Sequence, residues 1–474
     1  FGLLPLICAL PALFIAYPVI ETDTTVTAAL WHLLPLTIPL AVLTIACHAV
    51  SIALLIRLLS RPLRPGFHPA VGRAAFCAWA VTRLADTARR ALFPLYASLF
   101  TPVWLRMLGA RVGRRVEAST VLALPGLLRV DDGAFLADDT LLAPYELRGT
   151  WLYLGASHVG RRSFVGNSGI VGPGRHLPDS SLVGVLSDAP AHAPEGSSWL
   201  GRPAFALPRV AEAAGEGRTY SPPRRLMWAR AGVEVCRLLP VVLAALLGDL
   251  VFAALQELRD AFGIGAVLAA AGLVLIAAAV IACALTTAAK WLLVGRFRVA
   301  EHPLWSSFVW RNELYDTFVE ELAMPFGGST ITGTPYLNAW LRSLGAKIGR
   351  GAWCETHWLP ESDLVTIEAG ASVNRGTVLQ THLFHDRVMR LGPVHLGAGS
   401  TAGPHSIVLL NSSLGENTTV GPASLVMRGE NVPRASRWLG NPVAAWNADP
   451  TPPPGRRAAR AARAARGRRR TAGV

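Results

Sequence analysis

Charged residues are scarce in this chain. They make up 16% of its 474 residues, whereas hydrophobic residues make up 51% and the mean hydropathy is +0.37. This balance excludes an ordinary soluble protein and makes a membrane protein the first class to consider. A basic segment followed by a cleavage site of small residues is also missing, so no signal peptide is predicted. The chain begins at Phe1 and is apolar at once, and we therefore expect a fragment of a longer protein.

Metal-binding cysteine patterns are absent as well. The six cysteines are scattered, without a CxxC pair or a Cys/His cluster of zinc spacing, so we expect no metal and a thiol-reducing compartment. Positive charge is concentrated instead: the net charge is +14, and residues 456–470 hold eight Arg and no acidic residue. With the prolines before it, this segment predicts a disordered tail drawn to an anionic membrane surface. We expect no nucleic-acid partner, since no aromatic residues are interleaved with the arginines.

Apolar runs approach the length of about 20 residues that a transmembrane helix needs. Four are found, at residues 3–20, 33–59, 238–255 and 264–289. They form two hairpins whose inner connections hold few basic residues, while arginines and lysines gather at the outer ends. The positive-inside rule therefore predicts a multi-pass protein of the cytoplasmic membrane, with both large polar regions and the tail on the cytoplasmic side.

The sequence also contains a duplication. WLRMLGARVGRRV at 104–116 matches WLRSLGAKIGRGA at 340–352, and the His-Pro at 68–69 corresponds to that at 302–303. Such long-range repetition indicates two copies of one architectural unit. The predicted divisions are a transmembrane hairpin (1–60), a helical linker (61–103), a first repeat domain (104–210), a linker (211–232), a second hairpin (233–296), a helical linker (297–338), a second repeat domain (339–449) and the tail (450–474).

A finer period of six residues runs through both repeat domains. It fits neither an amphipathic helix nor an alternating strand, but it suits a parallel β-helix with three short strands in each coil. The aliphatic or small residue of each step is expected to point inward, and the small residues that follow it allow tight, left-handed corners. The inward residues are Val130, Leu136, Leu142, Val159, Val165, Val171, Leu177 and Val183, then Ile367, Val373, Leu379, Leu396, Ala402, Val408, Leu414, Val420 and Val426.

This repeat, with ENVPRASRWLGNPVAAW at 430–446, resembles the hexapeptide-repeat acyltransferases, and the resemblance covers both repeat domains. It implies left-handed coils, which are an exception to the usual right-handed crossover. The predicted fold class is therefore mixed membrane α plus all-β, with four transmembrane helices in two hairpins, each followed by a left-handed parallel β-helix. A homo-oligomer is possible, although two copies in one chain could replace contacts between subunits.

The alternation of membrane hairpins with repeat domains is similar to a narrower family. With WLRxLGAxIG, VLQTHLFHDRVMRLG at 378–392 and LVMRGE at 425–430, nearly the whole chain resembles the C-terminal membrane region of ε-poly-lysine-synthetase-like nonribosomal peptide synthetases. The resemblance implies that amide bonds form between an aminoacyl thioester, carried on phosphopantetheine, and an amino acid. It also implies adenylation and carrier domains upstream. No HHxxxDG of an ordinary condensation domain is present, so other residues would have to act.

The segment 379–392 is the predicted catalytic loop, because functional residues often lie on loops held by a rigid scaffold. Aligning the copies pairs Tyr145 with His382 and residues 154–155 with 396–397, which leaves about five extra residues in the second copy. Histidine has an ordinary pKa near 6.5 and suits a base that deprotonates an attacking amine. His382 best matches the loop histidine that does this work in the hexapeptide-repeat family.

Other residues are candidates around that base. His385 is the second choice of base, and Asp386 could orient a histidine or anchor a cationic substrate. His357 and Glu361 flank tryptophans at the entrance of the second β-helix and could bind the amine of a basic amino acid. The remaining substrate-binding candidates are Arg387 and Arg390, for a carrier phosphate, and His405, which more simply belongs to a coil turn.

Two other functions remain open. The same fold could be an acyltransferase that uses coenzyme A or an acyl carrier to modify a small or lipid substrate. Alternatively, the repeat domains could be scaffolds for membrane helices that export a peptide made elsewhere. Only Asp249 and His48 interrupt the apolar spans, which gives export little support.

Overall fold

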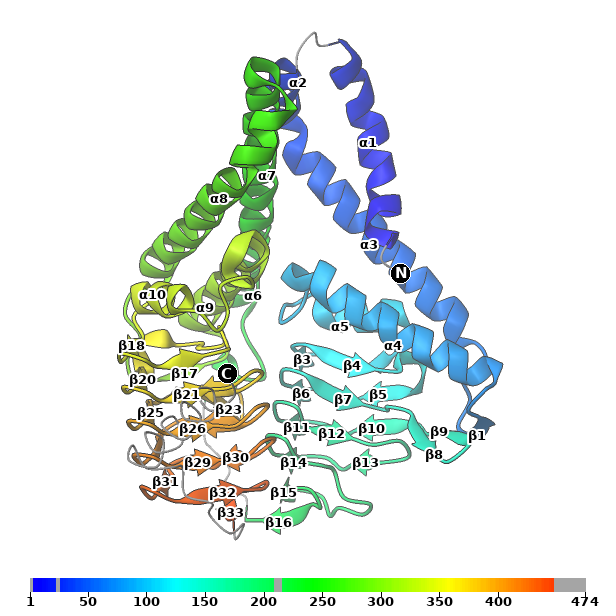
Figure 1. The fold of residues 1–474 in the computed structure, drawn as a ribbon. Helices are drawn as coiled ribbons and strands as arrows, with labels where there is room; N and C mark the ends of the chain where they lie inside the picture. Colours follow the sequence, from blue (N-terminus) through cyan, green and yellow to red (C-terminus); the bar gives the residue numbers. More distant parts are fainter. Residues whose placement is uncertain (1–2, 23–25, 209–214, 447–474) are drawn as a thin grey trace, which may run out of the picture.

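The computed structural model describes residues 3–22, 26–208 and 215–446, and the predicted tail lies outside these ranges. Two similar units stand side by side (Figure 1). In each, long helices lead into shorter helices that cover one end of a coil of short strands. The helices of the first unit are α1 (Leu4–Thr22), α2 (Val26–Leu33), α3 (Thr37–Ser60), α4 (Arg73–Ala91) and α5 (Thr101–Leu108). Those of the second are α6 (Arg224–Val235), α7 (Leu238–Phe262), α8 (Ile264–Leu293), α9 (Ser307–Phe318), the π-helix η5 (Val319–Gly328) and α10 (Pro335–Ser343).

In the part of the chain that the structure describes, three helical segments are long and apolar enough to cross a membrane. They span Trp31–Ser60, Arg224–Phe262 and Ile264–Leu293 and include three of the four predicted spans. The fourth prediction falls on α1, whose apolar part, Leu4–Val19, is shorter and contains three prolines. The helices α7 and α8 form a tight hairpin that turns at Gly263, where φ is +80° and a glycine is favoured.

The strands of each unit wind through three sheets in turn. In the first coil the sheets contain β2 (Arg111–Val112), β5 (Leu128–Val130), β10 (Ser157–Val159) and β13 (His176–Leu177); β3 (Glu117–Ala118), β6 (Phe135–Leu136), β11 (Phe164–Val165), β14 (Leu182–Val183), β15 (Ser198–Leu200) and β16 (Phe205–Leu207); and β4 (Val121–Ala123), β7 (Thr140–Leu142) and β12 (Ile170–Val171). Neighbours pair in parallel, except for β16, which turns back on β15.

The second coil repeats this topology. Its sheets contain β18 (Lys347–Ile348), β20 (Val365–Ile367), β25 (Val394–Leu396), β28 (Ser412–Leu414) and β31 (Asn431–Val432); β19 (Trp353–Cys354), β21 (Ser372–Val373), β26 (Thr401–Ala402), β29 (Thr419–Val420), β32 (Arg437–Leu439) and β33 (Ala444–Ala445); and β22 (Val378–Gln380), β27 (Ile407–Leu409) and β30 (Leu425–Val426). Leu396 lies opposite Leu414 and Leu414 opposite Val432, a step of 18 residues that equals three repeats of six.

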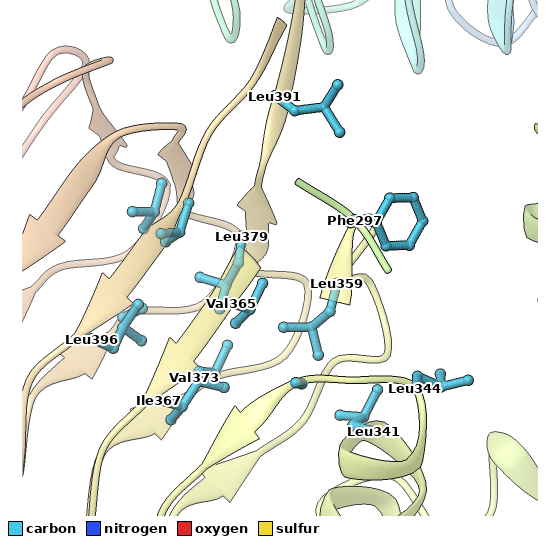
Figure 2. Close-up of a cluster of buried hydrophobic side chains, with 14 of the residues drawn as sticks. Phe297, Leu341, Leu344, Leu359, Val365, Ile367, Val373, Leu379, Leu391 and Leu396 are labelled. Atoms are coloured by element: carbon cyan, nitrogen blue, oxygen red, sulfur yellow. The ribbon is translucent and has the colours of Figure 1, made fainter. Parts of the chain in front are cut away.

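The prediction of inward residues from the six-residue period is confirmed. All of the predicted positions in both coils are buried, each with at most 1% of its surface exposed. Figure 2 shows Val365, Ile367 and Leu396 directed into the interior of the second coil, where each layer of side chains packs on the next. Burying a residue of this size contributes about 1.5–3 kcal/mol, so the stack replaces a conventional core. The corners take the left-handed conformation, as at Asn417 and Ala423.

A β-hairpin leaves each coil and pairs with a strand beside the helices. In the first unit β8 (Glu146–Arg148) and β9 (Trp151–Leu154) pair with β1 (Gly66–Pro69); in the second, β23 (His382–His385) and β24 (Val388–Leu391) pair with β17 (Glu301–Pro303). The prediction of an extra loop in the second copy is therefore wrong. Leu154 is equivalent to Leu391, and the histidine equivalent to His158 is His395, because each follows its hairpin by four residues.

Candidate active site

A cavity of about 540 Å³ lies between the two coils, beneath α9 and η5. The first coil contributes the corners that follow β3, β6 and β11, and the second contributes β22, the hairpin strand β23 and part of β24. Phe135 of the first coil and Phe384 of the second meet across it, with 5.1 Å between ring centroids. Since both units form its walls, the cavity requires the duplicated architecture rather than a single coil.

His382 lines this cavity and is bound to a buried carboxylate. Its Nδ1 lies 2.9 Å from Oε1 and 3.0 Å from Oε2 of Glu361, whose side chain is fully buried. The other ring nitrogen, Nε2, has no hydrogen-bond partner among the residues that the structure describes. An imidazole held by a carboxylate through one nitrogen, with the other facing a cavity, is the arrangement of a general acid or base.

Two further side chains hold Glu361 in place. The Oγ1 of Thr381 donates to Oε2 at 2.6 Å, and the Nδ2 of Asn312, from α9, donates to Oε1 at 3.0 Å. Burial alone would raise the pKa of Glu361, but His382 and these two donors outweigh it, and the pKa is lowered. Glu361 is therefore ionised and accepts the Nδ1 hydrogen of His382. Every oxygen of this carboxylate is used in orienting the ring.

The same pair sets the charge of the histidine. Burial disfavours the charged ring, but Glu361 outweighs burial and raises the pKa of His382 to about 9. Asp138 of the first coil and Asp316 of α9 add to this effect. At neutral pH the ring is mostly an imidazolium, and in its neutral form it is a stronger base than an ordinary histidine.

The first unit has no equivalent of this group. The two hairpins are equivalent, as are the helices α4 and α9, so Leu124 occupies the position of Glu361, Tyr145 that of His382, and Ala78 that of Asn312. These three residues pack together in an apolar cluster with Leu154. The first coil thus forms a wall of the cavity but holds no equivalent dyad.

Three other predicted site residues lie at separate positions around the second coil. His357 is 2.8 Å from Oε1 of Glu320, a residue of η5 that lines the cavity, so it supports a wall residue. Arg390 pairs with Glu301 at the base of the hairpin, with 3.0 Å between Nε and Oε1. His405 takes φ +57° at an exposed corner of the coil and does not line the cavity. The sequence analysis predicts that these residues surround one substrate, but the structure does not bring them together.

The tip of the hairpin contains three more of the predicted site residues. Asp386 and Arg387 form its two-residue turn with φ of +44° and +63°, and His385 lies beside Asp386, 3.7 Å between Nε2 and Oδ2. The prediction that Arg387 contacts a carrier phosphate is wrong. Its guanidinium is buried against the first coil and donates to four backbone carbonyls, those of Thr219, Arg115, Gly133 and Ala134.

Replacing Arg387 with alanine is expected to lower the free energy of unfolding by about 3 kcal/mol, because several buried carbonyls lose their donor. The midpoint of thermal unfolding in lipid nanodiscs measures the effect. Arg390→Ala is the matched control on the same hairpin, since its partner Glu301 is 61% exposed and such a pair contributes less than about 1 kcal/mol. Equal losses in the two variants would contradict a docking role for Arg387.

The helices α9 and η5 bring further residues to the cavity that no motif in the sequence indicated. These are Asn312, Glu313, Asp316, Glu320 and Glu321, and they face Asp138 and Asp139 from the first coil. The π-helical turn that carries Glu320 and Glu321 contains Pro325, which has no N–H to continue an α-helical ladder, and such turns are frequent at functional sites. Within the described residues, no group of three or more His, Cys, Asp or Glu side chains is arranged to hold a metal ion.

Comparison with known proteins gives one extended similarity. The chain is 33% identical over 435 residues to a protein named delta-poly-L-ornithine synthetase from Acinetobacter baumannii (strain AB307-0294), and the match covers 90% of this chain and 32% of that protein. The chain thus resembles about a third of a poly-amino-acid synthetase. No protein-family model matches it. A solved maltose O-acetyltransferase from Clostridium difficile 630 shows 13% identity and a TM-score of 0.23, covering 31% of this chain and 94% of that one, which is too weak a likeness to support an argument.

Proposed function

We propose that this chain forms amide bonds between an aminoacyl thioester and the amine of an amino acid, with His382 as the general base. The observation that carries the proposal is the His382–Glu361 dyad at the wall of a cavity between the two coils. The similarity to a poly-amino-acid synthetase over 90% of the chain supports the same chemistry. By analogy with that protein's name, a diamino acid such as ornithine is the proposed acceptor.

In this mechanism the neutral imidazole acts first. Nε2 of His382 takes one proton from the substrate ammonium and releases it to solvent, and Glu361 stabilises the imidazolium in between. The resulting amine attacks the thioester carbonyl, so that a C–N bond forms and the C–S bond breaks. The proton lost by nitrogen as the amide forms passes to the departing sulfur, which leaves as a thiol.

Stabilisation of the oxyanion requires a hydrogen-bond donor beside the base. Gln380 lies two residues before His382, is nearly fully buried and lines the cavity. Its Oε1 accepts from Nδ2 of Asn167 in the first coil at 3.4 Å, which leaves its own NH₂ group directed elsewhere. We assign the donor role to this group.

The thioester is proposed to arrive on phosphopantetheine, which would supply the activated carbonyl. The cavity fits such an arm, because apolar side chains such as Phe135, Phe164 and Leu383 line one side. Arg90 lines the same cavity with a side chain that is 74% exposed, and it is the residue best placed for a phosphate. Adenylation and carrier domains, which would load the amino acid as its thioester, are the proposed partners of this chain.

The finer architecture belongs to the same proposal. We infer that both coils are left-handed β-helices of the hexapeptide-repeat kind, and that the apolar helices place them at the cytoplasmic face of the cell membrane. The first coil then serves as a wall and a docking platform, and the second carries the chemistry. Two coils in one chain make an oligomer unnecessary for completing the site.

The test is product formation by the chain in lipid nanodiscs. Ornithinyl thioester on a phosphopantetheine-bearing carrier domain is mixed with free L-ornithine, and the dipeptide is detected by mass. We expect dipeptide from the carrier thioester. Transfer only from acyl-coenzyme A would instead favour a simple acyltransferase, and hydrolysis at the background rate alone would favour a scaffold or exporter.

A further inference from the structure

Asn312 has an unused hydrogen-bond acceptor at the cavity. Its side chain is only 2% exposed and lines the cavity, and its Nδ2 donates to Glu361. Its Oδ1 has no hydrogen-bond partner among the described residues. A buried acceptor without a donor is unfavourable, so a donor from outside the chain would complete the hydrogen bonding of this oxygen.

Asp316 lies one turn further along α9, on the same face as Asn312, and also lines the cavity. Its carboxylate has no hydrogen bond or ion pair within the described part of the chain. Burial raises the pKa of Asp316 well above its ordinary value, and the charge of Glu361 adds to this. An ionisable group kept in this state without a partner lowers stability, and it suits a cationic ligand that restores the pairing.

The acidic side chains around the cavity outnumber the basic side chains that could neutralise them. Among the basic residues of the cavity, Arg237 binds Glu313 at 2.7 Å, Arg89 binds Asp86 and Asp139, and Arg90 also binds Asp86. Glu321, whose pKa is raised to about 7 by burial and by Glu320, has no cationic partner within the described ranges. An excess of acceptors and negative charge matches a primary ammonium group, which has one positive charge and three donors.

The first unit again provides an internal comparison. Asn312 corresponds to Ala78 and Asp316 to Thr82, because α4 and α9 begin at equivalent positions after their His-Pro strands. The orphan acceptor and the unpaired carboxylate therefore occur only in the unit that carries the dyad. Packing of the helix on its coil does not require them, since the first unit has an alanine and a threonine at these two positions.

We propose that Oδ1 of Asn312 and the carboxylate of Asp316 bind the non-reacting ammonium group of a diamino acid, while its other amino group reacts at His382. This inference rests on the proposed function for the identity of the second group. A carboxylate beside the reacting nitrogen would hold its proton and oppose attack, so the site suits the amino group that stays charged. It would select acceptors with two amino groups over those with one.

Equilibrium binding tests the site without any catalysis. L-ornithine is titrated by calorimetry into the chain in nanodiscs, beside L-norvaline, which lacks the side-chain ammonium, and 5-aminopentanoate, which lacks the α-ammonium. We expect ornithine to bind the unaltered chain about tenfold or more tightly than the analogue that lacks the ammonium group held at Asp316, the range of a charge-assisted hydrogen bond. Asp316→Asn, which keeps the shape, should bring ornithine to the level of that analogue and leave the affinity of that analogue unchanged. Glu368→Gln, on the outer face of the second coil, is the control.

The outcomes separate this site from the proposed reaction. Equal affinity for ornithine and both analogues, or unchanged ornithine binding in Asp316→Asn, would overturn the ammonium site even if dipeptide forms. Selective binding without any amide product would instead contradict the proposed reaction and support the ammonium site. Asp316→Asn should also unfold at a higher temperature than the unaltered chain when no ligand is present, because it removes an unpaired carboxylate, so a poorly folded variant would itself contradict the assignment.

Discussion

His382→Ala is expected to slow amide formation by about 10²- to 10⁴-fold, the usual contribution of a positioned general base. The reason is geometric: Nδ1 is held by Glu361, so Nε2 is the only nitrogen of the ring available to a substrate in the cavity. The measurement is the initial rate of dipeptide formation from a carrier-bound thioester. His382→Gln should fail equally, since its amide can donate to Glu361 but cannot take a proton.

His395 supplies the matched control for this change. It lies on the same coil, is also paired with a carboxylate, at 3.0 Å from Oε1 of Glu368, and is 44% exposed on the outer face. His395→Ala should leave the rate within about twofold of the unaltered chain, as expected for a surface change. If His382→Ala and His382→Gln both retained full activity while correctly folded, the base would have to be another residue.

The fold could be predicted from the sequence because its core obeys one simple rule. Residues such as Leu414 and Val420 recur every six positions, and each needs only the coil before and after it for burial. The alignment of the two copies was wrong where a hairpin interrupts the six-residue period. Both domains leave the six-residue pattern for a hairpin, and the period alone cannot tell whether it resumes at Leu391 or at Leu396. Pairing with β1 and β17 decides this, and such antiparallel contacts with distant strands leave no periodic signal.

The site was predicted only in part, for a related reason. The sequence indicated His382 and Glu361 separately, as a base and as a substrate ligand, because they lie in different segments of the second coil. Their contact depends on how the coil closes, and the contact with Asn312 depends on how α9 packs on its end. One signal was available: aligning the two copies shows polar residues of the second replaced by Ala78, Leu124 and Tyr145 in the first.

A second large effect is expected from Glu361→Gln, which should move the pH dependence of the reaction downward. In the unaltered chain, His382 must lose its proton to act, so kcat/KM should rise with pH and level off above about 9. Without the carboxylate, burial is unopposed and disfavours the imidazolium, so its pKa should fall to its ordinary value of 6.5 or below. The rising limb therefore moves down by about two pH units or more.

The plateau rate of Glu361→Gln should fall at the same time, on the order of 10²-fold, because the ring becomes a weaker base and loses its fixed orientation. The full pH profile of dipeptide formation measures both effects, and Glu368→Gln, beside His395, should change neither. A limb that stays near pH 9 in Glu361→Gln would assign that titration to the substrate amine rather than to His382. A limb that moves with the charge of Glu361 comes from a group near this carboxylate; since Glu361 also raises the pKa of Asp316, the limb is assigned to His382 when Asp316→Asn keeps a rising limb above neutral pH while His382→Ala loses it.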